Sequence, residues 1–306
     1  MSPPLSFLMG PVSGQIRRWV LSAFPRDPAG GIDYDHPVGD AGLFGPNSVT
    51  WKINADFPGM LSGGLCALML QTLHPQALAG VWDHSNFRED LVGRLRRTTA
   101  FVGGTTYAPT ADARALIDRV RRIHGQVRGV TEAGVPYSAD DPDLLTWVHV
   151  TEMSSFLAGY RRYCRADLPP GAADAYYDET RRVAEALGAR DVPASEREVE
   201  AYFADVLPRL VYGERSRVVL DVLSRILLPV PMAGLSRELF LGAGAALLPG
   251  WAEDALQRTA SQRRGARLAA HTLKGMSPLF RRALKDGVAS RSCRRVGVTP
   301  ELLTRW

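Results

Sequence analysis

His124 lies between two arginines at helical spacing, and this arrangement could hold a metal-containing ligand. The segment from Asp112 to Val130 carries apolar residues at three- and four-residue steps, which predicts one face of an amphipathic helix. Arg121 precedes His124 by three residues and Arg128 follows it by four, so we expect all three side chains on the same side. An imidazole between guanidinium groups would suit a metal whose attached ligand carries anionic groups, and haem with its propionates is one such ligand.

A structural role for His124 is the alternative. A single histidine on an apolar face is usually a hydrogen-bonded core residue, and arginines beside it usually pair with carboxylates of a neighbouring helix. From this segment alone the structural interpretation is favoured. Stretches upstream change that balance.

The helix predicted from about Phe87 to Val102 carries a second pair of polar residues. Arg94 and Thr98 are four residues apart and therefore share one side of that helix. Gly103 and Gly104 are expected to end the helix. Thr110 is expected to cap the next helix, which carries His124.

The most apolar segment runs from Gly59 to Ala79 and predicts a buried helix interrupted or ended at Pro75. Gly63 and Gly64 within it would admit either a flat ligand or a close helix crossing. The sequence leaves both interpretations open.

The rest of the chain also predicts helices. Asp140 to Asp143 form a helix start, and the helix that follows is long and largely buried, with His149 in its middle. Further helices are predicted over residues 172–187 (ending at Gly188), 196–207 (capped by Ser195), 215–228, 235–248 and 251–274. No stretch longer than a few residues alternates like a strand. We therefore predict an all-α fold.

Residues 1–50 are rich in proline, glycine and aspartate and predict an extended N-terminal arm, with a short helix around residues 15–23. The arm is expected to pack on the body through Phe44, Val49 and Trp51. With no linker long enough to separate two domains, residues 51–306 are predicted to form a single multi-helix domain.

The composition is that of a globular protein and excludes several classes. The chain has 306 residues and 3 cysteines, none in a Cys-x-x-Cys pair, which argues against zinc ribbons and a disulfide framework. No signal peptide and no apolar run of about 18 residues is apparent, so a cytoplasmic location without a transmembrane segment is expected. The net charge is +5, with arginines concentrated late in the chain, but little aromatic interleaving accompanies them, and no nucleic-acid partner is expected.

Common catalytic motifs are absent from the sequence. It contains no His-Glu-x-x-His, no phosphate-binding Gly-x-x-x-x-Gly-Lys and no Gly-x-Ser-x-Gly. His149 and Glu152 are three residues apart on one helical face, but two ligands alone do not hold zinc.

Five blocks of the sequence together resemble a known family. In chain order they are LFGPNSVTWKI, LMLQTLHPQALAGVWDHSNF, GRLRRTT, RIHGQVRG and DPDLLTWVH. They are similar to the signature blocks of the MpaB-type and latex-clearing (rubber) oxygenases and span roughly Leu43 to Tyr160. No single block is decisive, but five in the family's order form a specific signal.

The resemblance implies an all-helical fold, a b-type haem and roles for the residues found above. By this resemblance, His124 is the proximal iron ligand, Arg121 and Arg128 help to hold the propionates, and Arg94 and Thr98 lie beside the haem. With the resemblance, haem binding becomes the favoured interpretation of His124.

The sequence departs from rubber-cleaving members at two positions. Their distal lysine corresponds here to Arg97, and no glutamate lies between Trp51 and Arg88, where those members carry a distal glutamate. Both departures argue against polyisoprene as the substrate. If Arg97 points distally, it could donate a hydrogen bond toward O2. It could equally face solvent.

The sequence hypothesis is a haem b-dependent oxygenase that acts with O2 on an apolar small molecule, with Arg97 and Thr98 as catalytic candidates. The alternatives are a haem peroxidase-like enzyme and a non-catalytic haem carrier or sensor. His74, His84 and His149 are candidates for a second axial ligand in the last case. An all-α interaction protein that docks through its basic tail is a further alternative.

Overall fold

The computed structural model describes residues 14–15, 17–18, 31–226 and 233–306, and these residues form an α-helical body with one short hairpin. The all-α prediction is confirmed. Most of the arm's first thirty residues, including most of the helix predicted around residues 15–23, lie outside the described part.

Two antiparallel helices, α3 (Phe57–Gln71) and α7 (Pro142–Tyr163), cross at the centre of the body. Their backbones approach closely because both carry glycine at the crossing. A Cβ on Gly159 would lie 2.3 Å from the Gly59 carbonyl oxygen, and one on Gly63 would lie 2.6 Å from the Ser155 carbonyl oxygen. A Cβ on Gly64 would meet only a ring carbon of Phe156, at 3.7 Å. Gly63 therefore serves a close helix crossing, which settles for this residue the choice that the sequence left open.

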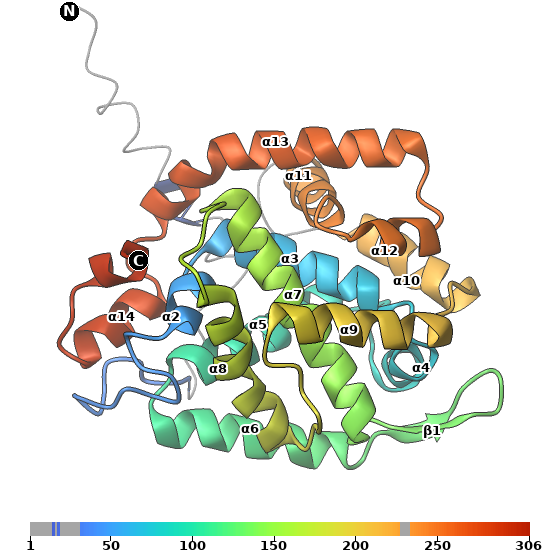
Figure 1. Ribbon diagram of the computed structural model, residues 1–306, viewed down its shortest axis with the longest axis horizontal. Helices are drawn as coiled ribbons and strands as arrows, with labels where there is room; N and C mark the ends of the chain where they lie inside the picture. The colour runs from blue at the N-terminus through green and yellow to red at the C-terminus, as the bar shows by residue number, and fades with distance from the viewer. Residues whose placement is uncertain (1–13, 16, 19–30, 227–232) are drawn as a thin grey trace, which may run out of the picture.

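Two further groups of helices cover this central pair (Figure 1). On one side α11 (Ala233–Ala245) and α13 (Ala260–Ala283) pack on α3. On the other side lie α2 (Val49–Asn54), α5 (Leu91–Tyr107), α6 (Thr110–His124) and α8 (Ala172–Leu187). The remaining elements are α4 (Pro75–His84), α9 (Glu196–Val206), η1 (Leu207–Arg209), α10 (Glu214–Ser224), α12 (Gly250–Ala255), α14 (Val288–Arg295) and η2 (Pro300–Thr304).

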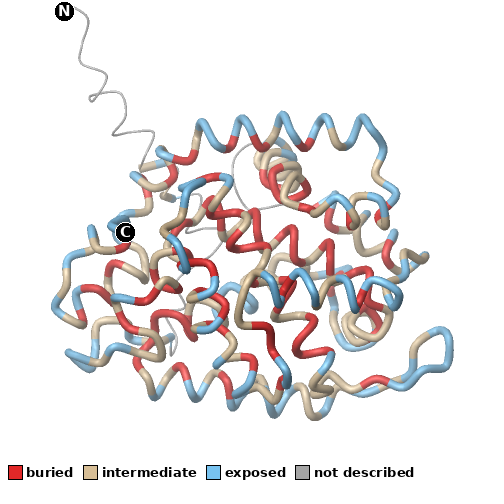
Figure 2. Tube along the Cα trace, in the orientation of Figure 1, coloured by how far each residue is buried: buried red, intermediate tan, exposed pale blue. Residues whose placement is uncertain are grey.

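Apolar burial is concentrated at the interfaces of α3 and α7, whereas the outer face of α13 is exposed (Figure 2). Within the described ranges, no helix is both long and apolar enough to cross a membrane.

Local signals in the sequence predicted several helix ends correctly. The Asp141 carboxylate accepts from the first backbone amides of α7, Gly188 ends α8 with φ 117°, and Ser195 caps α9. Pro75 begins α4 after α3 has ended, as predicted.

Four of the sequence expectations were wrong. α5 does not end at Gly103 but continues to Tyr107, because Gly104 packs tightly under Leu116 of α6. The N-cap of α6 is Pro109, and the amide and hydroxyl of Thr110 instead donate to Asp40. The segment predicted as one helix over residues 251–274 is split into α12 and α13 by a capping box at Thr259.

The fourth error bears on the site, because the predicted helix over residues 112–130 ends at His124. Beyond the Gly125 cap the chain forms strand β1 (Arg128–Val130), which pairs antiparallel with β2 (Pro136–Ser138), Arg128 opposite Ser138. This hairpin was not predicted. Arg128 is therefore on a strand, not on the helix that carries His124.

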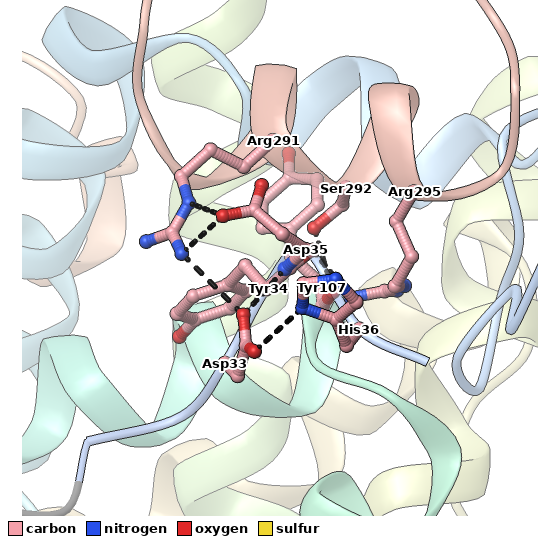
Figure 3. Close-up of polar contacts among 8 residues, drawn as sticks. All are labelled: Asp33, Tyr34, Asp35, His36, Tyr107, Arg291, Ser292 and Arg295. Atoms are coloured by element: carbon pink, nitrogen blue, oxygen red, sulfur yellow. Dashed lines mark hydrogen bonds and ion pairs between the residues drawn. The ribbon is translucent and has the colours of Figure 1, made fainter. Parts of the chain in front are cut away.

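The described part of the arm lies against the C-terminal helix α14 (Figure 3). The guanidinium of Arg291 pairs with Asp35 at 2.6 Å and Asp33 at 3.6 Å. The buried Arg295 donates to the carbonyls of Tyr34 and Asp40 at 3.1 and 2.8 Å. Further along, Trp51 is fully buried and Phe44 and Val49 are partly buried in the body, as predicted. The arm thus packs on the C-terminal helix α14 and leads directly into α2.

Candidate active site

His124 ends α6 with a half-buried imidazole. Burial lowers the pKa of this ring, and the negative charge of Asp140 opposes that shift only in part. Its Nδ1 is buried and has no hydrogen-bond partner within the described structure. A buried ring nitrogen without a partner is uncommon in a plain core, where polar atoms are normally satisfied. Burial therefore favours the neutral form of His124, and the neutral imidazole is the form that ligates metals.

The β-hairpin brings Asp140 back to the end of α6. The Val127 amide donates to the His124 carbonyl at 3.0 Å, and the Ala139 amide donates to the Val127 carbonyl at 2.9 Å. These bonds set the segment after β2 beside the helix end. The exposed Arg128 guanidinium lies 3.8 Å from the Asp140 carboxylate, a loose pair at the surface. Asp140 is thus the carboxylate whose charge acts on His124, although it does not hydrogen-bond to the ring.

Arg121 lines an open surface pocket of about 1050 Å³. Its charged lining residues are Asp118, Arg121, Arg122, Asp140, Asp141 and Arg190, and His124 does not line it. The exposed Arg121 side chain makes no ion pair with any described residue. The structure therefore keeps Arg121 and Arg128 near the same end of α6, but on different elements and at the surface.

Arg94 is half-buried on α5. Burial and the neighbouring Arg97 lower the pKa of this guanidinium, and the charge of Glu152 on α7 opposes them. Within the described residues the guanidinium makes no hydrogen bond or ion pair. Thr98 follows one turn later, and its hydroxyl donates to the Arg94 carbonyl at 3.3 Å. Arg94 and Thr98 thus share one side of α5, as expected.

Arg97 lies on the outer surface. Its side chain is 64% exposed, and its guanidinium lies 3.6 Å from Asp90, the N-cap of the same helix. In this arrangement it faces solvent rather than the interior. A distal hydrogen-bond donor at this position would need a different rotamer, so that role stays a prediction.

His149, a candidate second ligand from the sequence, and Glu152, to which the sequence assigned no role, lie one turn apart on α7. Burial lowers the pKa of His149 to about 4, and its Nε2 is buried without a partner within the described structure. Burial raises the pKa of Glu152 to about 7, against the opposing effects of Arg94 and a hydrogen bond from Gln71. Their three-residue spacing was visible in the sequence, but only the fold shows that both side chains are half-buried and that the charges of Glu152 and Arg94 act on each other.

The other two histidines proposed as second ligands have structural contacts. The Nδ1 of His74 accepts from the Ala77 amide at 3.5 Å as the N-cap of α4, and its ring packs at a tilt against Trp147, with ring centroids 5.6 Å apart. The exposed His84 has Nε2 at 3.0 Å from the Arg128 carbonyl. Of the three candidates, His149 alone has a buried ring nitrogen without a hydrogen-bond partner in the described part of the chain.

These residues fit a flat cofactor held by a single histidine. His124 supplies an imidazole with a buried nitrogen that has no hydrogen-bond partner. Ile123, next to His124 in the chain, is 49% exposed. The residues in the first turns of α5 are exposed or half-buried. Within the described residues no cluster of three or more His, Cys, Asp or Glu side chains could hold a bare metal ion. A haem requires only one protein ligand and cationic groups for its propionates, which this set provides.

Comparison with known proteins gives one match. Residues 51–275 match a family model described as the catalytic domain of the ER-bound oxygenases mpaB and B' and of rubber oxygenase. No curated protein and no solved structure matches the chain. The matched range contains α3 to α12, most of α13, the His124 turn, the hairpin and both α7 residues described above. Since the match covers well over half of the sequence, the chain belongs to the family of mpaB-type and rubber oxygenase catalytic domains.

Proposed function

We propose that this protein is a haem b-dependent oxygenase that uses O2 to oxidise an apolar small molecule. The observation that carries the proposal is the half-buried, neutral His124 with its unpartnered Nδ1, in a chain of an oxygenase family. Haem, when bound, supplies the one-electron and O2 chemistry that amino-acid side chains lack. His124 would hold the iron.

The arginines around the end of α6 would hold the acidic groups of the cofactor. Arg121 has no ion-pair partner within the described residues, and Arg128 has only the loose contact of 3.8 Å with Asp140. Both guanidinium groups are therefore available to anionic groups at the surface, where haem propionates commonly reach solvent. Neither arginine would have to leave a strong internal salt bridge first.

Arg94 and the exposed Thr98, one turn apart on α5, would lie beside the cofactor. The half-buried Arg94 side chain provides a positive charge, which acts more strongly as water is excluded around it. Arg97 would contribute only if its side chain left Asp90 and turned inward. The charged groups named here would hold the cofactor, and the exposed Ile123 side chain would offer an apolar contact to a substrate.

A spectroscopic experiment tests the proposal directly. The full chain, purified from cells supplied with a haem precursor, should show a Soret band and bind carbon monoxide after reduction. His124→Gly should lose the haem or change its spectrum, and added imidazole should restore the original bands. His271→Ala is the matched control, because His271 is an exposed histidine on α13. Colourless wild-type protein under these conditions would show that the proposal is wrong.

The same sample separates the alternatives. A six-coordinate, low-spin spectrum that is lost in His149→Ala would favour a haem carrier or sensor. Turnover that requires peroxide and proceeds without O2 would favour a peroxidase-like enzyme.

A further inference from the structure

Helix α13 carries a continuous basic stripe on the outside of the body. Residues three, four and seven positions apart lie on one side of a helix. One such stripe of α13 contains Arg264, Arg267, Leu268, His271, Lys274, Gly275, Pro278 and Arg282. All eight residues are exposed, and Figure 2 shows the outer edge of α13 coloured mostly as exposed. At a rise of about 1.5 Å per residue, the stripe is about 27 Å long.

The positive charge of this stripe is not offset on the helix itself, because α13 contains no aspartate or glutamate. Within the described residues no ion pair and no hydrogen bond is formed by the side chains of its four cations, which are Arg264, Arg267, Lys274 and Arg282. The nearest acidic residues along the chain on either side are already paired. Asp254 lies 2.5 Å from Arg263, and Asp286 lies 3.3 Å from Arg17. The stripe is thus open to an anionic partner.

The inner face of α13 fixes the orientation of the stripe. Ala266, Ala270, Leu273, Ser277 and Phe280 are buried on that face, where α13 packs on α11 and α3. The helix cannot rotate without exposing these residues to water, so only its outer face is available to a partner. The fold therefore presents the cations side by side, in one row along the surface.

Two features of this face favour a lipid surface over a nucleic acid. Leu268 is 69% exposed among the cations, and an apolar side chain gains free energy from a partner that removes it from water. A lipid bilayer combines anionic headgroups with an apolar interior. The stripe has no aromatic ring to stack on a base and no Asn or Gln to read an adenine, because the one aromatic residue of α13, Phe280, is buried.

We propose that the outer face of α13 docks this protein on the surface of an anionic lipid bilayer. The four cations lie against the lipid headgroups, and Leu268 enters the apolar boundary beneath them. Arginine and lysine suit this arrangement, because their long stems cover apolar surface while the charge stays at headgroup level. The contact is peripheral, and it depends neither on a cofactor nor on His124.

Vesicle flotation with the full chain is the first test. The protein should float with vesicles of phosphatidylcholine and phosphatidylserine, stay unbound with phosphatidylcholine alone, and leave the anionic vesicles when the salt concentration is raised. Each cation near an anionic bilayer strengthens binding about five-fold, so the double variant Arg264→Gln, Arg267→Gln should lower the partition constant about 25-fold. No flotation with the anionic vesicles, or equal flotation with both kinds, would overturn the proposal.

The matched control is the double variant Arg114→Gln, Arg119→Gln. Both arginines are exposed on α6, without an ion pair to any described residue, and α6 lies across the body from α13 (Figure 1). This variant removes the same net charge, so it should float nearly as well as the wild type. Equal weakening in the two double variants would show that binding follows net charge and not this face, and would reject the proposal. Circular dichroism verifies that both variants are folded.

Leu268→Ala separates a bilayer from other polyanions. The substitution keeps the charge of the stripe, so it should weaken binding to the anionic vesicles several-fold and leave binding to heparin and to duplex DNA unchanged. Tighter binding of the wild type to DNA than to the vesicles, or unchanged flotation of Leu268→Ala, would assign the face to a polyanion and reject the lipid surface. Neither result bears on haem binding, which the Soret band tests separately.

Discussion

Asp56 at the start of α3 and Arg281 near the end of α13 form an ion pair that joins the central helix to the outer layer. The Asp56 side chain is 3% exposed, and it also accepts from the Gly59 amide at 2.9 Å as the N-cap of α3. The same arginine donates to the Tyr163 carbonyl at the end of α7. One carboxylate and one guanidinium therefore link α3, α7 and α13.

We expect Asp56→Ala to lower the free energy of unfolding by about 3–5 kcal/mol, because it removes the cap and leaves Arg281 unpaired. Urea unfolding followed by circular dichroism measures this. In a double-mutant cycle with Arg281→Ala, the double variant should lose less than the sum of the two single losses. Arg217→Ala, which breaks an exposed pair with Glu214 at 3.4 Å, is the control and should change little. Equal losses in Asp56→Ala and Arg217→Ala would contradict the structural role of the buried pair.

Gly63→Ala should be strongly destabilising and Gly64→Ala should not. The added methyl group at Gly63 would lie 2.6 Å from a backbone oxygen of α7, so the two central helices would have to separate. At Gly64 the nearest atom is a ring carbon at 3.7 Å, an ordinary contact, and alanine also favours helix. We expect a loss of about 2 kcal/mol or more for Gly63→Ala, typical of overpacking. Thermal melts of the two variants compare neighbouring glycines in one helix, and similar melting temperatures would refute the crossing described here.

His74→Asn should make the protein less sensitive to mild acid. Burial lowers the pKa of His74 from 6.5 to about 4, so between these values the unfolded chain binds a proton that the folded chain does not. Stability therefore falls as the pH drops from 6.5 to 4, by up to about 3 kcal/mol from this group. Asparagine keeps a capping side chain at the start of α4 but does not titrate.

The measurement is the free energy of unfolding of wild type and His74→Asn at pH 7, 5.5 and 4.5. The variant should be less stable at pH 7, where it lacks the stacking on Trp147, and the difference should shrink on acidification. His149→Asn should show the same trend, because burial lowers the pKa of His149 to about 4 as well. A constant difference across the pH range would show that His74 is not buried as a neutral ring.

Glu152→Gln should have the opposite dependence on pH. Burial raises the pKa of Glu152 from 4.5 to about 7, so the folded chain keeps a proton that the unfolded chain loses between these values. Wild-type stability therefore falls as the pH rises from about 4.5 to 7, by on the order of 2–3 kcal/mol from this group. Glutamine removes this loss. We expect the variant to gain stability relative to wild type from pH 5 to pH 8 in chemical denaturation, and a parallel course of the two curves would rule out a buried, protonatable carboxylate.

The sequence predicts those features of this protein that depend on a few neighbouring residues. Helix ends with a capping side chain or a left-handed glycine need only a few neighbouring residues, and Asp141, Gly188 and Ser195 were predicted correctly for that reason. The capping box at Thr259 is equally local, with Gln262 three residues on, so the break between α12 and α13 was also readable in the sequence.

The sequence by itself determined the helical class, the oxygenase family and the choice of His124 as the central residue. It did so because periodicity and signature blocks are patterns along the chain. The hairpin that takes Arg128 off the helix, by contrast, depends on pairing with Ser138 ten residues later. The effect of Arg94 and Glu152, 58 residues apart, on each other's pKa depends on how α5 and α7 are placed. Only the tertiary structure decided these contacts and the burial that keeps His124 neutral, because desolvation and charge act through space and not along the chain.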